Sequence, residues 1–219
     1  MLKIYGVYRS RASRNIWLAH ELSVPFELVP VIQANRLVDP LAKGAPLNTQ
    51  SPEFLKINPG GQIPSIKDGD FVMHESLAIN LYLAKKHGGA LAPANAKEDG
   101  LMTQWSLWAA ATAEPSTIQI IYHRLDNATV KRNPALADAA VEALRAPFAM
   151  LDGALAANGG HLVGGRFTVA DINVAEVIRY ALPAPELFEP TPHIRAWLAA
   201  CHARAAFKKM MATREAEPA

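Results

Sequence analysis

The stretch of sequence that decides the fold is residues 58–76, which read NPGGQIPSIKDGDFVMHES. Asn-Pro-Gly-Gly at its start predicts a tight turn. Two short strands follow, at 63–67 and 71–73, and Asp68-Gly69 between them is a hairpin signal. Apolar side chains on one face then predict a helix over 75–87. The stretch therefore predicts a β-β-α arrangement.

The sequence before this stretch predicts a second unit of regular structure. Residues 2–7 have the composition of a short buried strand, and a helical spacing of apolar residues follows them. That helix ends before Pro25, because proline disfavours helical geometry at the preceding residue. Residues 26–32 then alternate as a strand does. Strand, helix and strand within so short a segment are typical of a parallel βαβ pair.

The strand signal stops after a linker at 88–96, and the rest of the chain is rich in Ala, Leu and Glu, which favour helices. The predicted helices span 97–124, 134–157, 169–180 and 192–212. Glu114-Pro115 is expected to bend the first of these, because proline removes a backbone hydrogen bond. The predicted domains are therefore 1–87, which is α/β, and 97–219, which is all-helical.

Composition excludes several classes of function. The formal net charge of the 219 residues is only +2, which gives no general reason to expect nucleic acid or an anionic membrane as a partner. No apolar run approaches the roughly 18 residues that span a bilayer. Cys201 is the sole cysteine, and a cytoplasmic location is the expectation. We expect the Cys201 side chain to be a small buried hydrophobe rather than a reactive thiol. No metal is predicted.

The best-defined local signal in the second half is Phe167-Thr168-Val169-Ala170-Asp171. Thr168 can cap the unpaired N–H groups of a new helix, and Asp171 can reach back to the N–H of Thr168. We interpret this capping box as a folding motif, because chemistry does not need Asp171.

The loop Tyr8–Arg14 is the first candidate for chemistry. It lies between the first strand and the first helix, where a helix N-terminus exposes unpaired N–H groups and a positive partial charge. Hydroxyls there, from Ser10 or Ser13, can donate to an anion, and Arg11 and Arg14 add positive potential. This environment suits a stabilised thiolate better than a serine nucleophile, since no histidine base is near in sequence. The alternative is that both serines are helix caps.

Two further elements have the chemistry to hold a peptide. Ile63-Pro64 can have a cis peptide bond, which would turn the backbone groups of Ile63 outward to pair with an extended ligand. Ser76, at the start of a helix, offers a hydroxyl and an N–H to a carboxylate, and Glu75 can pair with an ammonium group. The alternatives are an ordinary trans proline and a capped helix.

A fourth element lies in the first helix of the predicted helical domain. Trp105 and Trp108 are three residues apart and share a face. Core packing is the alternative interpretation for either one.

In order and spacing, these elements together resemble the cytosolic glutathione transferase family over nearly the whole chain. The motifs are a serine loop before the first helix, Asn-Pro-x-Gly-x-Ile-Pro, Glu-Ser opening a helix, a Trp-rich helix and the Phe-Thr-Val-Ala-Asp capping box. The resemblance implies a thioredoxin-like domain followed by an all-α domain, in a homodimer. It does not assign a class within the family.

The resemblance also implies roles for individual residues. Ser10 is the hydroxyl next to the glutathione sulfur, and Ser13 is the second choice. Counted back from Arg14, the catalytic position of several classes falls on Arg9, and a one-residue difference in the loop restores Ser10. The residues expected to bind glutathione are Gln62, Ile63, Pro64, Glu75 and Ser76. The residues expected at the electrophile site are Trp108, Thr112 and Glu114.

The implied function is detoxification by conjugation of the glutathione thiolate to a small, mainly apolar electrophile, with glutathione as co-substrate. The main alternative is a non-catalytic module of the same fold, acting in stress response or protein interaction. A glutathione-dependent isomerase or dehalogenase is a third. A disulfide reductase is disfavoured, because the active-site loop has no cysteine.

Overall fold

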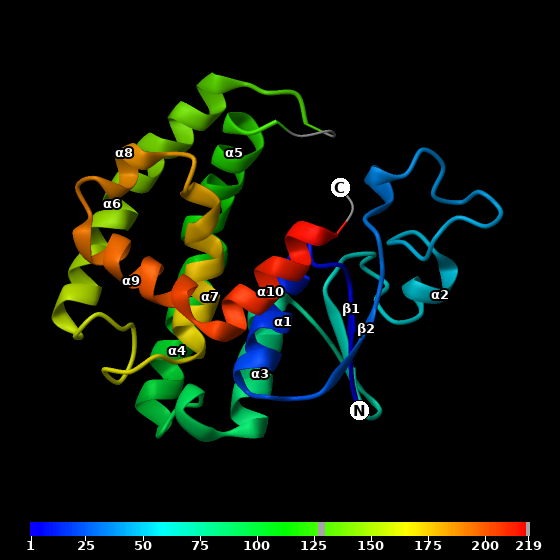
Figure 1. Ribbon diagram of the computed structural model, residues 1–219, viewed down its shortest axis with the longest axis horizontal. Coiled ribbons are helices and arrows are strands. Elements are labelled where there is room, and N and C mark those ends of the chain that lie inside the picture. The colour runs from blue at the N-terminus through cyan, green and yellow to red at the C-terminus, as the bar shows by residue number, and fades with distance from the viewer. Residues whose placement is uncertain (127–129, 218–219) are drawn as a thin grey trace. The chain divides into compact units, whose positions relative to one another are not determined.

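The computed structural model describes residues 1–126 and 130–217 (Figure 1). The chain divides into two compact units, Met1–Lys86 with Ala205–Ala219, and His87–Arg204. Residues 127–129 and 218–219 of the helical domain predicted over 97–219 lie outside the described residues. The predicted fold class, a small α/β domain with a helical one, is confirmed.

The first unit contains one four-stranded sheet with the order β2-β1-β3-β4. Its elements are β1 (Leu2–Tyr5), α1 (Ala12–Glu21), β2 (Phe26–Val29), η1 (Ala34–Arg36), α2 (Pro52–Leu55), β3 (Ser65–Asp68), β4 (Phe71–His74), α3 (Ser76–His87) and α10 (Ala205–Ala216). β1 pairs parallel with β2 and antiparallel with β3, and β3 pairs antiparallel with β4. The predicted βαβ unit and the hairpin at Asp68-Gly69 are therefore confirmed.

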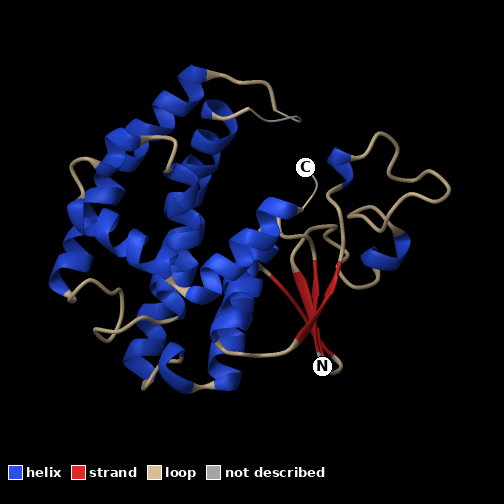
Figure 2. Ribbon diagram, in the orientation of Figure 1, coloured by secondary structure: helices blue, strands red, loops and turns tan. Residues whose placement is uncertain are grey.

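Helices α1 and α3 cover one face of this sheet, and α2 lies on the other side (Figure 2). α1 is buried over most of its length, from Ala12 to Ala19. The reason is that α10 packs along its outer side (Figure 1), with the rings of Trp17 and Phe207 4.9 Å apart. The structure thus groups α10 with the first unit, although the sequence places it more than 100 residues beyond the sheet.

The second unit is helical. Its elements are η2 (Gly89–Leu91), α4 (Ala96–Trp108), η3 (Ala109–Ala113), α5 (Glu114–Arg124), α6 (Pro134–Ala157), α7 (Val169–Ile178), η4 (Arg179–Ala181), α8 (Pro185–Phe188) and α9 (Pro192–Ala203). The predicted helix over 134–157 is confirmed. The single helix predicted over 192–212 is wrong, because the backbone at Arg204 is extended (ψ 141°) and separates α9 from α10.

Three local predictions concern this unit. A bend was expected at Glu114-Pro115, and directly before it a π-helical turn, η3, joins α4 to α5. The capping box at the start of α7 is confirmed: the Thr168 N–H donates to Asp171 Oδ2 at 2.8 Å. Cys201 is buried on α9, as predicted.

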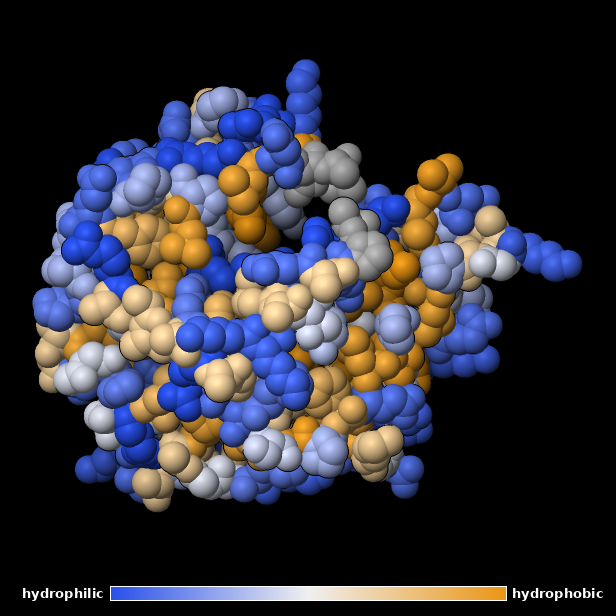
Figure 3. Space-filling view, viewed as in Figure 1, coloured by the Kyte–Doolittle hydropathy of each residue, from blue (hydrophilic) through white to orange (hydrophobic). Residues whose placement is uncertain are grey.

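Hydrophilic and hydrophobic residues are mixed over the face seen in Figure 3. Among the helices of the described chain, none combines the length and the apolar character that crossing a membrane requires.

Candidate active site

Gly6 lies where two of the predicted site elements meet, the Tyr8–Arg14 loop and Ile63-Pro64. A Cβ added to this residue would be 2.8 Å from Ala12 Cβ, 3.6 Å from Ser10 Oγ and 3.7 Å from Ile63 Cβ. Its φ of 151° also disfavours a side chain. The absence of a side chain here lets the β1–α1 loop approach the residue before Pro64. The structure therefore brings Ser10 and Ile63 together.

The Ser10 hydroxyl has two local hydrogen-bond partners. It donates to the carbonyl of Val7 at 2.7 Å and accepts from the N–H of Ala12 at 3.1 Å. The second bond satisfies a backbone donor at the start of α1, so the helix-capping interpretation holds in part. A hydroxyl carries a single proton to donate. Donation to a ligand sulfur therefore requires Ser10 to release Val7.

Ser13, the second choice for this role, lies in the first turn of α1 and is fully buried, at 0% exposure against 7% for Ser10. Its N–H donates to the carbonyl of Ser10 at 3.2 Å. A fully buried side chain has no surface to offer a ligand. Burial therefore favours Ser10 over Ser13.

The Ile63-Pro64 peptide bond is cis, as expected. The turn before it is held by Asn58, whose Nδ2 donates to the carbonyl of Gln62 at 2.7 Å and to Ser65 Oγ at 3.2 Å. The side chain of Gln62 is exposed. The turn thus fixes the backbone on both sides of Ile63 and leaves the amide of Gln62 accessible.

Glu75 has a left-handed backbone conformation, with φ of 68°, and its side chain is exposed. A non-glycine residue held there costs on the order of 1–3 kcal/mol, and such strain gathers at ligand sites. Glu75 directly precedes α3, and its carbonyl accepts the N–H of Ile79 at 2.8 Å. The strained backbone presents a carboxylate beside the N-terminus of α3.

Ser76 is buried and bound from α1. Arg14 Nη1 donates to Ser76 Oγ at 3.0 Å, and Asn15 Nδ2 donates to the carbonyl of Ser76 at 2.8 Å. The Arg14 guanidinium, which the sequence suggested for the sulfur, therefore lies at the Ser76 end of the site. Asn15 was not among the predicted site residues. A lone asparagine inside a helix gives no sequence signal for such a contact.

The residues expected at the electrophile site belong to the second unit. The Trp108 side chain is half-buried and its ring meets that of Trp105 edge to face at 5.4 Å. Thr112 is exposed on the π-helical turn, and Glu114 is buried. π-helical turns are rare and occur often at functional sites. The structure thus gives this segment an unusual backbone at the predicted position.

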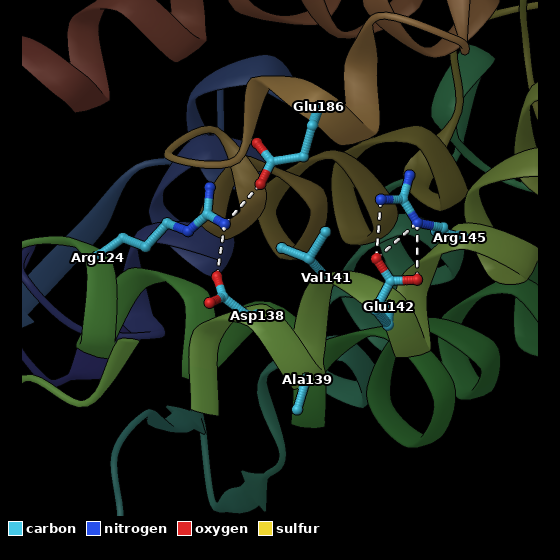
Figure 4. A pocket seen from close by; sticks show the side chains of 7 residues that line it. All are labelled: Arg124, Asp138, Ala139, Val141, Glu142, Arg145 and Glu186. Atoms are coloured by element: carbon cyan, nitrogen blue, oxygen red, sulfur yellow. Dashed lines mark hydrogen bonds and ion pairs between the residues drawn. The ribbon is translucent and has the colours of Figure 1, made fainter. Parts of the chain in front are cut away.

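A charged pocket lies elsewhere in the second unit (Figure 4). Arg124 bridges Asp138 at 3.2 Å and Glu186 at 2.5 Å, and Arg145 pairs with Glu142 at 2.8 Å. Each guanidinium points at a carboxylate rather than into open space. None of these residues was predicted as part of a site, and their mutual pairing is typical of a solvated ion-pair network. Among the described residues, no group of His, Cys, Asp or Glu is placed to hold a metal ion.

Comparisons with known proteins identify the family of the chain. The family model "Glutathione S-transferase, N-terminal domain" matches residues 9–86, and "Glutathione S-transferase, C-terminal domain" matches 108–205. The chain is 33% identical to glutathione S-transferase 3 of Zea mays, over 96% of this chain and 93% of that protein. It is 26% identical to human glutathione S-transferase theta-1, over 90% of this chain and 80% of that protein.

Solved structures are also similar. An apo structure of glutathione S-transferase III has a TM-score of 0.81 at 31% identity, covering 100% of this chain and 99% of that one. Glutathione transferase F7 from Populus trichocarpa has a TM-score of 0.81 at 27% identity, with coverages of 98% and 99%. The chain belongs to the glutathione S-transferase family. It is a glutathione transferase, and its class within the family stays unassigned.

Proposed function

We propose that this enzyme binds glutathione on the first unit and conjugates its thiolate to small, mainly apolar electrophiles. The observation that carries the proposal is the meeting of Ser10 Oγ and Ile63 around Gly6. A hydroxyl for the sulfur and the residue whose backbone would bind the cysteinyl unit are then both within 3.7 Å of the Cβ position of Gly6. The solved structure of glutathione S-transferase I bound with lactoylglutathione, at 25% identity and a TM-score of 0.82, supports a glutathione-type ligand.

The peptide is held by the residues of the two adjoining elements. Ile63, before Pro64, pairs through its backbone with the cysteinyl unit, and Gln62 contacts the glycyl end. Ser76 binds the γ-glutamyl carboxylate at the N-terminus of α3, and Glu75 pairs with the ammonium group. The strained backbone conformation of Glu75 supports this role, because such conformations gather at ligand sites.

Ser10 stabilises the thiolate. A free thiol has a pKa near 8.5, and the thiolate is the nucleophile. When glutathione binds, the Ser10 hydroxyl exchanges its bond to the Val7 carbonyl for one to sulfur. A neutral hydrogen bond contributes about 0.5–1.5 kcal/mol and one to a charged group about 1.5–3 kcal/mol, so the exchange favours the thiolate.

The sulfur then attacks an electrophilic carbon. A C–S bond forms as the bond to the leaving group breaks, and the electron pair departs with that group. Trp108, Thr112 and Glu114 are proposed to line the electrophile's side of the reaction. An apolar surface such as the Trp108 ring discriminates weakly between small substrates, which fits a broad detoxifying activity. We also propose that the protein is a homodimer and that it is located in the cytoplasm.

A glutathione-binding titration run beside a conjugation assay over a panel of electrophiles tests the proposal. The expected result is saturable glutathione binding together with turnover of at least one apolar electrophile. Binding without turnover on every electrophile would favour a non-catalytic module, and an absence of binding would contradict the proposed site.

A further inference from the structure

The two residues before Ser10 are bound by a segment more than 200 positions away in the sequence. The carboxylate of Glu217 accepts the N–H of Tyr8 at 3.0 Å through one oxygen and the N–H of Arg9 at 2.7 Å through the other. Hydrogen bonds to a charged acceptor are about twice as strong as neutral ones. One carboxylate thus fixes two consecutive peptide groups of the loop.

The contact is reciprocal. Arg9 Nε donates to the carbonyl of Arg214 at 3.2 Å, and Arg9 Nη2 donates to that of Glu215 at 3.3 Å. Both carbonyls lie in the last turn of α10, where a cation is favoured by the helix dipole. Arg214 in turn donates to the carbonyl of Tyr8. We call the side chains of Arg214 and Glu217, together with the carbonyls of Arg214 and Glu215, the α10 clamp.

Other groups face the same loop. Arg36, at the end of η1, donates to the carbonyl of Arg9 at 2.8 Å. The Tyr8 hydroxyl interacts with the side chain of Thr213, and burial raises the pKa of that hydroxyl. Polar groups on the backbone of residues 8 and 9 are therefore engaged by side chains from outside the sheet. The strand pairing of β1 ends earlier, at Tyr5.

From these contacts we propose that Glu217 is a positioning residue for Ser10. This inference rests on the proposed function. Ser10 directly follows the two clamped residues, and its hydroxyl must keep its place near Ile63 while it changes partner from Val7 to sulfur. Misplacing a catalytic group by about 1 Å costs about a hundredfold in rate. The α10 clamp holds the loop still during that exchange.

Glu217→Gln tests the inference, with the thiol of bound glutathione titrated by its thiolate absorbance. The substitution has two effects on the pKa of the bound thiol, and they have opposite signs. Loss of positioning weakens the Ser10 bond to sulfur and raises the pKa of the bound thiol. Loss of a nearby negative charge alone lowers that pKa, because a carboxylate repels the thiolate.

We expect the pKa of the bound thiol to rise by about one unit in Glu217→Gln, which leaves about tenfold less thiolate below that pKa. Turnover near neutral pH falls by the same factor, and glutathione affinity changes less. Glu215→Gln is the matched control, because the clamp uses only the carbonyl of Glu215. It should behave as the wild type does.

Arg9→Lys supplies a second test that leaves the net charge unchanged. It removes the two-point contact with α10, and it should raise the pKa of the bound thiol as Glu217→Gln does. The inference would be overturned if the pKa of the bound thiol fell or stayed unchanged in Glu217→Gln. It would also be overturned if that pKa stayed unchanged in Arg9→Lys. A wild-type protein whose bound glutathione titrates like the free thiol would instead overturn the proposed function, and the inference with it.

Discussion

Ser76, the residue proposed to bind the γ-glutamyl carboxylate, already accepts a hydrogen bond from Arg14 through its hydroxyl. Ser76→Ala should weaken glutathione binding by about 1–3 kcal/mol, the cost of losing a hydrogen bond to a charged group. It should also lower the melting temperature, since Arg14 loses a buried partner. Calorimetric titration measures the first effect and thermal unfolding the second.

Thr168→Ala separates these two effects. It removes a helix cap in the second unit, which should cost about 0.5–2 kcal/mol of stability and leave glutathione affinity unchanged. If folded Ser76→Ala bound glutathione as tightly as the wild type does, Ser76 would not belong to the site.

At the scale of elements, the start of α4 is braced by Glu98 and Arg166. The two side chains form a bidentate pair at 2.9 and 2.6 Å, and Arg166 also donates to the carbonyls of Ala90 and Ala92. The Arg166 hydrogen bonds, followed by that from the Ala94 N–H, lower the pKa of Glu98 to about 2. The brace therefore ties the linker before α4 to the loop before α7.

This brace predicts acid sensitivity. The folded protein binds the Glu98 proton less tightly than the unfolded chain does, so the stabilisation is present above the unfolded pKa, near 4.5, and is lost as the pH falls toward about 2. Glu98→Gln should lower the melting temperature at neutral pH and reduce its fall across that window. Thermal unfolding at several pH values measures both. Glu189→Gln, an exposed glutamate of the same unit, is the control. Parallel acid curves for Glu98→Gln and wild type would refute the role of the brace.

At the scale of the whole molecule, local patterns predicted most elements, because apolar spacing and turn residues encode them. The break at Arg204 was missed because Ala-rich sequence on both sides favours a helix, while the extended backbone there is set by the packing of α10 on α1. For the site, the sequence alone indicates the hydroxyls at helix starts and the Ile63-Pro64 motif. The bond from Tyr8 to Glu217 was not, because 209 residues separate the two and neither position has a local signal.

The homodimer is also a property of the whole molecule. Two-fold dimers are the commonest oligomers of soluble proteins, and the family resemblance favours one here. Light scattering at micromolar concentration should give the mass of two chains, independent of dilution over about tenfold. A mass of one chain would contradict the proposed assembly.

The central claim is that the Ser10 hydroxyl stabilises the thiolate, and the pH titration of bound glutathione in Ser10→Ala tests it most directly. We predict a pKa below the free value of about 8.5 in the wild type, and a rise toward that value in Ser10→Ala. The loss of rate should shrink as pH rises, because more thiolate then forms without help. Glutathione affinity should change less than turnover. Ser13→Ala is the matched control and should leave the titration unchanged. The account would be contradicted if the pKa of the bound thiol stayed unchanged in Ser10→Ala, or if it changed only in Ser13→Ala.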